Sequence, residues 1–148
     1  MAIRLIVIHS TAGGFDSSLK ILRGWTEREV SSHYLINTDG KIYQLVDERE
    51  KAWHAADLNG ISIGIEIVDN AKTNLKDYLT VNQYINILKL TRNIADRYKI
   101  PRQYVNFDGF NSLSNQGRIS KILAEKDIKG IIFHRDISTV IKVDPTGF

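Results

Sequence analysis

Two histidines and an aspartate that lie far apart in the chain have the residue types of a hydrolytic metal site. His9 ends the apolar run of residues 5–8, His134 ends that of residues 130–133, and Asp144 lies near the C-terminus. A side chain at the end of a buried strand projects from a rigid element into the space above the sheet. Two imidazoles and one carboxylate would give a zinc ion three protein ligands and one open coordination position, which is typical of a catalytic zinc site.

A second carboxylate competes with Asp144 for the role of ligand. Asp136 lies only two residues after His134, and we expect it to orient the local loop or a ligand rather than to bind metal directly. Asp144 itself has an alternative role, because an aspartate before Pro145 is also a common turn residue.

Composition limits the possible chemistry and the possible partners. The chain has 148 residues, of which 43% are hydrophobic and 25% are charged, values that suit a single ordered domain. It has no cysteine, which excludes disulfides, thiolate zinc sites and cysteine nucleophiles. The net charge of +3 favours approach to an anionic polymer, such as a cell wall or a nucleic acid, and does not select between them. We expect no nucleic-acid binding and no membrane span, because the chain has no basic run, no nucleic-acid motif and no apolar run of spanning length.

Five strands can be predicted from apolar runs and turn signals. Residues 3–8, 62–68 and 130–134 are apolar runs typical of buried strands. Residues 32–37 and 41–46 flank an Asp-Gly turn, which predicts a hairpin.

Two helices separate the later strands. Thr80 and Gln83 have the spacing of a capping box, and Pro101 marks the end of the helix that they open. Its apolar residues fall at helical spacing: Val81, Tyr84, Ile85, Leu88, Ile94, Ala95 and Tyr98. A second helix is expected within residues 112–127. Together these elements predict an α/β fold in which one mixed sheet is flanked by helices.

Six segments resemble one family in sequence and in order. They are IVIHSTAG around His9, SHYLI at 32–36, the Asp-Gly hairpin, AWHA at 52–55, SIGIE at 62–66, and the stretch from His134 to Pro145. The set is similar to the zinc-dependent N-acetylmuramoyl-L-alanine amidases of type 2, whose fold is shared with phage T7 lysozyme and the peptidoglycan recognition proteins. The resemblance implies one amidase domain over residues 1–148, with residues 106–129 as an insertion that could flank the substrate groove or be a surface feature.

The resemblance also implies roles for individual residues at the metal. Zinc would be bound by His9, His134 and Asp144, and the ammonium of Lys142 would meet the oxyanion of the tetrahedral intermediate. An exposed lysine of no special function is the alternative for Lys142.

Glu66 is the residue that the resemblance implies for proton transfer. Its neighbours Ile65 and Ile67 are apolar. Strand alternation therefore places Glu66 on the opposite face from them, where the metal is expected. The alternative is a solvated glutamate at the edge of a strand.

Three further residues are expected to bind substrate. Tyr34 could hydrogen-bond the substrate carbonyl or line the groove, although a core tyrosine is the alternative. His54 could be proposed as a third zinc nitrogen, but the resemblance implies a groove residue near the metal. Asn59 fits the place of an asparagine that the family often has shortly before SIGIE. His33 is expected to be structural and Trp53 to lie in the core.

The predicted function is hydrolysis of the amide between N-acetylmuramic acid and L-alanine in peptidoglycan or muropeptides. A non-catalytic module that binds muropeptides is the alternative, and we expect a monomer. The setting could be the cell envelope or the exterior, with a leader outside this chain. It could equally be the cytoplasm, for a recycling enzyme or a bacteriolytic phage endolysin.

Overall fold

The computed structural model describes residues 2–11, 13–24, 26–69 and 79–137. Its centre is a five-stranded sheet in the order β3-β2-β4-β1-β5. The strands are β1 (Leu5–Ser10), β2 (Tyr34–Ile36), β3 (Ile42–Gln44), β4 (Ser62–Ile67) and β5 (Gly130–Phe133). The pairs β2–β4, β4–β1 and β1–β5 are parallel. The edge strand β3 is antiparallel to its neighbour β2. The predicted mixed sheet is therefore confirmed.

The hairpin of β2 and β3 is closed by the predicted Asp-Gly turn. The Asp39 carboxylate accepts from the Lys41 backbone N–H at 2.8 Å. Gly40 has a φ of 88°, a left-handed conformation that suits glycine. A Cβ at Gly40 would also lie 2.8 Å from the backbone of Asn82, so the turn packs directly against the first turn of helix α2 (Val81–Tyr98).

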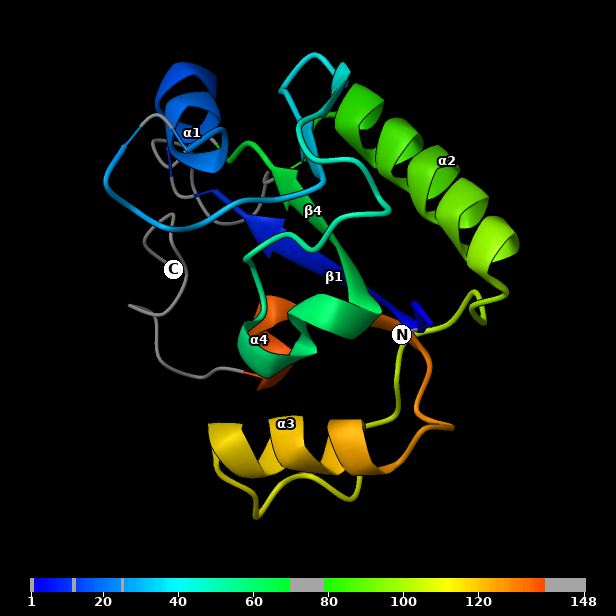
Figure 1. Ribbon diagram of the computed structural model, residues 1–148. Helices are drawn as coiled ribbons and strands as arrows, with labels where there is room; N and C mark the ends of the chain where they lie inside the picture. Colours follow the sequence, from blue (N-terminus) through cyan, green and yellow to red (C-terminus); the bar gives the residue numbers. More distant parts are fainter. Residues whose placement is uncertain (1, 12, 25, 70–78, 138–148) are drawn as a thin grey trace.

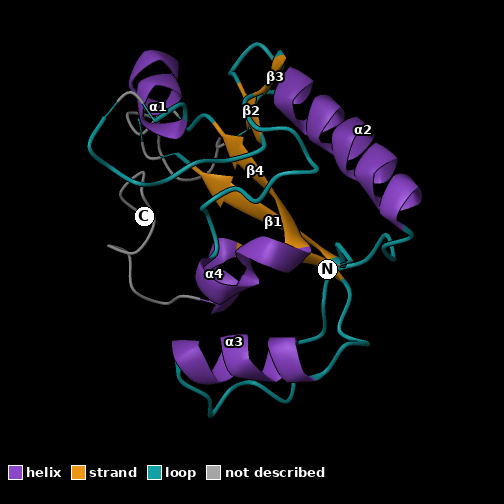
Figure 2. Ribbon diagram, in the orientation of Figure 1, coloured by secondary structure: helices purple, strands orange, loops and turns teal. Residues whose placement is uncertain are grey.

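Helices cover both faces of the sheet (Figures 1 and 2). Helix α2 (Val81–Tyr98) lies along one face, while α3 (Asn115–Ala124), the short α4 (His134–Ile137) and the 3-10 helix η1 (Ala56–Ile61) lie on the other. Helix α1 (Phe15–Leu22) packs through Leu22 near the β2 side of the sheet. None of the helices within the described ranges is long and apolar enough to cross a lipid bilayer.

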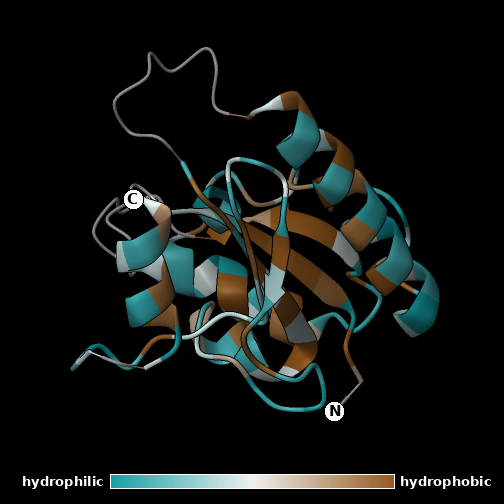
Figure 3. Ribbon diagram, turned by 90° about the horizontal axis from the view of Figure 1, so that it is seen from above, coloured by the Kyte–Doolittle hydropathy of each residue, from teal (hydrophilic) through white to brown (hydrophobic). Residues whose placement is uncertain are grey.

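Strand alternation divides the core into two layers. Ile6, Ile8, Ile63, Ile65 and Ile67 pack in the cluster that includes residues of α2. Leu5, Val7 and Ile132 pack in the cluster that includes residues of η1, α3 and α4. The strands are coloured as hydrophobic along most of their length (Figure 3), because both faces are covered.

Helix α2 begins at the predicted capping box, and a polar residue of that box lies on its buried face. Thr80 accepts from the Gln83 backbone N–H, and the Gln83 side chain accepts in return from Thr80. Gln83 is fully buried because its amide also donates to the Val68 carbonyl at 2.8 Å. The apolar residues Val81 and Leu88 are exposed, at 74% and 48%, so the apolar spacing of the first half of the helix does not coincide with its buried face.

Residues of the predicted insertion are joined to the main sheet. Ile119 and Ile122 of α3 pack in the same cluster as Leu5 and Val7 of β1. The guanidinium of Arg4 donates to backbone carbonyls just after and within the last turn of α3, including Ile122 and Ile128 at 2.7 Å. These bonds satisfy helix-end acceptors that would otherwise be without an intrahelical donor. The segment is thus part of the layer that covers the same face of the sheet as Leu5, Val7 and His9.

Candidate metal and catalytic site

The candidate site forms where four parallel strands end at the same edge of the sheet. His9 pairs with Glu66 in the β1–β4 register, and Glu66 pairs with Leu35 in the β2–β4 register. The β1–β5 register stops one position earlier, so His134 is the next residue beside His9. A row of side chains from four strands therefore converges at the carboxyl ends of parallel strands, the edge at which α/β proteins commonly bind ligands.

Glu66 lies on the face opposite to Ile65 and Ile67, as strand alternation predicts. It is fully buried. Its side chain is therefore shielded from solvent at the end of the strand that neighbours His9.

The spacing of the two histidines fits a shared metal ion. The ring centres of His9 and His134 are 5.0 Å apart, with the ring planes inclined by 37°. Imidazoles bound to one tetrahedral zinc at about 2.0–2.1 Å place their ring centres about 5 Å apart. Both donors are nitrogen atoms of the kind that zinc prefers, so the two residues fit the predicted ion.

The remaining predicted metal and oxyanion residues, Asp144 and Lys142, lie outside the described residues. Within the part of the chain that the structure describes, no cluster of three or more histidines, cysteines or carboxylates is placed to hold a metal. The third ligand is therefore still a prediction from sequence.

Asp136, the rival carboxylate, is engaged by the backbone around it. Its side chain accepts from the Phe133 backbone N–H at 2.8 Å, and its carbonyl accepts from the Arg118 guanidinium at 2.8 Å. These bonds fix the turn from β5 into α4, which carries His134 at its first position. This arrangement matches the expected role in orienting the loop.

His54 is buried behind His9 rather than exposed in a groove. Its Nδ1 lies 2.9 Å from His9 Nε2, and its Nε2 lies 3.2 Å from the Ser62 hydroxyl. Burial, together with the neighbouring histidines, places the pKa of His54 well below its usual value, so the ring is neutral. With 5% of its surface exposed, His54 is placed to support His9 and not to contact a polymer, in contrast to the substrate role expected from sequence.

Asn59 is buried as well, and its side chain serves the backbone. Its Oδ1 accepts from the backbone N–H groups of His54 and Ala55, at 2.9 and 2.6 Å. The expected place in the substrate groove is therefore not observed, because the amide oxygen is used to hold the loop that carries His54.

Comparison with known proteins decides the family. The sequence profile described as N-acetylmuramoyl-L-alanine amidase matches residues 1–147. The chain belongs to this family. It is 37% identical over 123 residues to N-acetylmuramoyl-L-alanine amidase AmiD of Escherichia coli (strain K12), an alignment that covers 70% of this chain and 44% of AmiD. The chain thus spans less than half the length of that relative.

Solved structures of amidase-family proteins are similar to this domain. The complex of E. coli AmiD with anhydro-N-acetylmuramic acid-L-Ala-D-gamma-Glu-L-Lys matches with a TM-score of 0.58 at 31% identity, covering 80% of this chain and 56% of that one. AmpDH3 from Pseudomonas aeruginosa gives a TM-score of 0.64 at 28% identity, with 97% and 54% covered. Drosophila peptidoglycan recognition protein SA shares the fold, with a TM-score of 0.54 at 22% identity and 70% and 65% covered. The predicted fold and the family resemblance are confirmed.

Tyr34 of this amidase-family domain is not brought to the site. It lies in the core cluster on the α2 face, and its hydroxyl donates to Glu48. Burial and this bond raise the pKa of Tyr34 far above its usual value, so the phenol is protonated. Alternation in β2 explains the placement, because Leu35, not Tyr34, is in register with Glu66. The structure corresponds to the core-tyrosine alternative.

Two neighbouring expectations have opposite outcomes. His33 is buried and structural, since its Nδ1 accepts from the Gly64 backbone N–H and its Nε2 bonds to the Glu50 carbonyl. Trp53 is 54% exposed, with the Lys51 ammonium 4.1 Å from the centre of its ring, and it is not a core residue.

Ser62 and Gly64 are the residues near the site that sequence reasoning missed. Ser62 bonds to His54, and a Cβ at Gly64 would lie 2.7 Å from the His54 ring. A glycine inside an apolar strand is the available signal, because it often marks the close approach of another group.

Proposed function

We propose that this domain hydrolyses the amide bond between the lactyl group of N-acetylmuramic acid and the L-alanine of the stem peptide. The observation that carries the proposal is the row of His134, His9 and Glu66 at the ends of adjacent strands in an amidase-family chain. AmiD, a relative at 37% identity, is named for this activity.

The metal-binding residues in this proposal are His9, His134 and Asp144, and the metal is zinc. The two histidines have the required spacing, while Asp144 is assigned from its sequence context. A zinc ion held there supplies Lewis acidity, which polarises the amide carbonyl and makes water a better nucleophile at neutral pH.

Glu66 is the proposed general base and acid. Its carboxylate accepts a proton from the attacking water and then delivers that proton to the departing amine of L-alanine. Its burial in register with His9 supports this assignment, because a general base must lie within reach of the proton that it accepts. Lys142 is proposed to stabilise the negative oxygen of the tetrahedral intermediate.

The proposed substrate class is the muropeptide, in intact peptidoglycan or in soluble fragments. AmiD has been solved in complex with the substrate anhydro-N-acetylmuramic acid-L-Ala-D-gamma-Glu-L-Lys, and AmpDH3 with an anhydromuramic pentapeptide. The ligand of AmiD contains the junction between anhydro-N-acetylmuramic acid and L-alanine. The envelope, extracellular and phage-lysin settings stay predictions from sequence, as does the monomeric state.

A digest of defined muropeptides tests the proposal. The zinc-loaded domain is incubated with N-acetylmuramoyl and anhydro-N-acetylmuramoyl peptides, and the products are separated by mass spectrometry. We expect a free sugar acid and a peptide with a new L-alanine amino terminus. Binding without this amine would indicate the non-catalytic module and would contradict the proposal.

A further inference from the structure

A relay of hydrogen bonds between buried polar groups joins η1 to His9. It consists of the Leu58 carbonyl, the Ser62 hydroxyl and the rings of His54 and His9. The Ser62 hydroxyl lies 2.8 Å from the Leu58 carbonyl and 3.2 Å from His54 Nε2, and His54 Nδ1 lies 2.9 Å from His9 Nε2. All four residues are buried. The three contacts have the distances of hydrogen bonds, so the position of each proton in the relay depends on the positions of the others.

The Leu58 carbonyl, at one end of the relay, determines which group donates in each of these bonds. The Leu58 carbonyl can only accept, so Ser62 uses its single hydroxyl proton to donate to it. The Ser62 oxygen must therefore accept from His54, which requires a proton on His54 Nε2. A charged imidazole is costly to bury, and the His54 ring is buried with its Nε2 donating to Ser62, which makes its Nδ1 the acceptor. The proton between the two histidines then belongs to His9 Nε2.

The surrounding residues hold His54 in this position. Asn59 accepts from the backbone N–H groups of His54 and the following residue. Gly64 leaves the space that the ring occupies, since a Cβ there would lie 2.7 Å from His54 Nδ1 and Cγ. Burying an imidazole is unfavourable unless both nitrogens are bonded, and here each ring nitrogen has a protein partner.

We propose that Ser62 and His54 are positioning residues that hold His9 as the tautomer with a proton on Nε2 and the lone pair on Nδ1. The inference rests on the proposed function, in which His9 binds zinc. A histidine ligand must offer an unprotonated nitrogen to the metal, and the partner of its other nitrogen selects which one that is. The relay thus selects Nδ1 of His9 before any metal arrives.

Nitrogen NMR of the wild-type domain tests the tautomer directly. Long-range ¹H–¹⁵N spectra of the metal-free protein are recorded at about pH 8, above the usual imidazole pKa of about 6.5. We expect the signals of a protonated Nε2 and an unprotonated Nδ1 for both His9 and His54. A protonated Nδ1 in His9 would overturn the proposal, whether or not the domain cleaves muropeptides.

Substitutions along the relay test its effect on zinc affinity. Ser62→Ala removes the acceptor for His54 Nε2–H, and we expect affinity for Zn²⁺, measured against a chromophoric chelator, to fall roughly 10–100-fold. The matched control is Ser32→Ala, which removes another buried serine hydroxyl that bonds to the carbonyls of Gly64 and Tyr34 but lies outside the relay. Equal affinities in the two variants would contradict the proposal.

A second pair of variants separates the relay from simple packing. His54→Asn places an amide oxygen near the position of Nδ1, where it can accept from His9, whereas His54→Ala cannot. Both leave a cavity, so their melting temperatures should be similar. We expect the asparagine variant to retain more zinc affinity and more of the Nε2-protonated His9 signal. Equal zinc affinities and equal His9 spectra in the two variants would show that His54 acts only through packing.

The readouts distinguish the two proposals. Tautomer and zinc affinity are measured without substrate, so loss of the proposed amidase activity would leave the relay standing. Conversely, cleavage of muropeptides by a domain whose His9 has the opposite tautomer would overturn the relay alone.

Discussion

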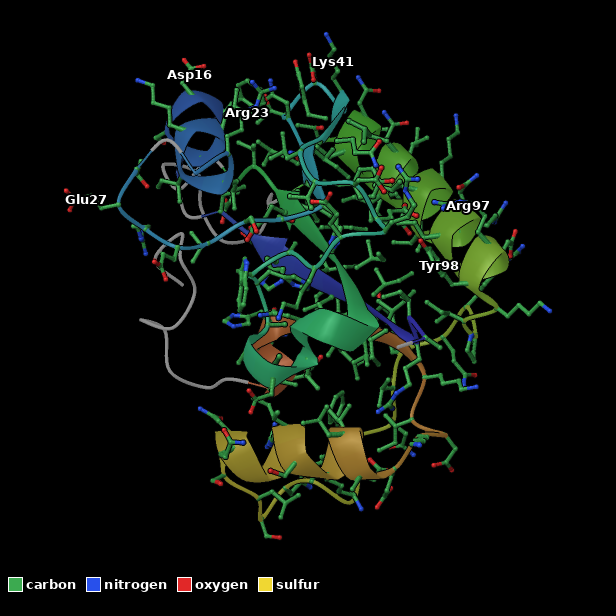
Figure 4. The ribbon with its side chains drawn as sticks, viewed as in Figure 1. Asp16, Arg23, Glu27, Lys41, Arg97 and Tyr98 are labelled. Carbon is green, nitrogen blue, oxygen red and sulfur yellow. The ribbon has the colours of Figure 1, made fainter. Side chains whose placement is uncertain are left out.

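Glu66 and Glu48 are both buried carboxylates, and they belong to opposite faces of the same sheet. Glu48 is tied to other elements: it accepts from Arg97, Tyr34 and Tyr98. Arg97 and Tyr98 project from the C-terminal half of α2 (Figure 4). Glu66 is instead in register with His9 at the end of its strand, in the row that includes His134.

The electrostatics of Glu48 fit a structural role. Burial acts to raise its pKa, but the hydrogen bonds from Arg97, Tyr34 and Tyr98 outweigh burial and hold the pKa at about 2. A carboxylate this acidic is always ionised near neutral pH and exchanges no protons there. Burial alone therefore does not make a catalytic carboxylate. The donors around Glu48 fasten the loop after β3 to α2, whereas Glu66 lies in register with His9.

Replacing Glu66 should have the largest effect on activity. Glu66→Gln keeps the size of the side chain but removes the proton acceptor, and we expect turnover of muropeptide to fall roughly 10²–10⁴-fold. Zinc content and the melting temperature should change little. The measurement is the rate of appearance of the L-alanine amine. Full activity in this variant would remove Glu66 from the mechanism.

The two candidate carboxylate ligands can be separated by zinc content. Asp144→Ala should lower zinc affinity by more than about 100-fold, because losses of roughly 10–100-fold are typical when only an outer partner is removed. Zinc is measured after dialysis against a weak chelator. Asp136→Ala is the matched control: it breaks the bond to the Phe133 N–H and should keep most of the zinc. The reverse result would make Asp136 the ligand.

Replacing Glu48 in the same way, by glutamine, should affect the stability of the domain rather than its catalytic activity. Glu48→Gln replaces a charged acceptor by a neutral one opposite Arg97, whose side chain is 46% exposed. Solvent screening limits the loss, and we expect the free energy of unfolding to fall by about 1–3 kcal/mol, measured by urea denaturation. Turnover per folded molecule should stay at the wild-type level. A catalytic defect without loss of stability would contradict the distinction between the two carboxylates.

The smallest expected effect is a dependence of stability on pH. The folded-state pKa of Glu48, about 2, lies below its usual value of 4.5, so the unfolded chain binds protons more readily. Stability from this group is complete above about pH 5 and is lost as the pH falls from 4.5 toward 2. Denaturation curves measured over this window should show a shallower decline for Glu48→Gln than for the wild type. Parallel declines would show that Glu48 does not supply this stability.

Local signals predicted the parts of the fold that local chemistry determines. The Asp39-Gly40 turn, the capping box of Thr80 and Gln83, and the last helix before β5 are all observed. The buried face of α2 was not predictable from apolar spacing, because Gln83 is held inside by a bond to the distant Val68 carbonyl.

Contacts between residues distant in the sequence also explain which of the site residues could be placed correctly from the sequence. Strand alternation correctly placed Glu66, since its apolar neighbours are adjacent in the sequence. Tyr34 could not be assigned to a face in this way, because its partner Glu48 lies fourteen positions along the chain. The roles of His54 and Asn59 depend on bonds formed across a loop, and a sequence motif does not say which atoms those bonds use.

Anomalous X-ray diffraction from zinc-loaded crystals of the domain would locate the metal relative to His9 and His134. We expect one strong zinc peak between the rings of His9 and His134, within about 2.2 Å of a nitrogen from each and of an Asp144 oxygen. A zinc peak at other residues, or none beside these two histidines in crystals that contain stoichiometric zinc, would contradict this expectation.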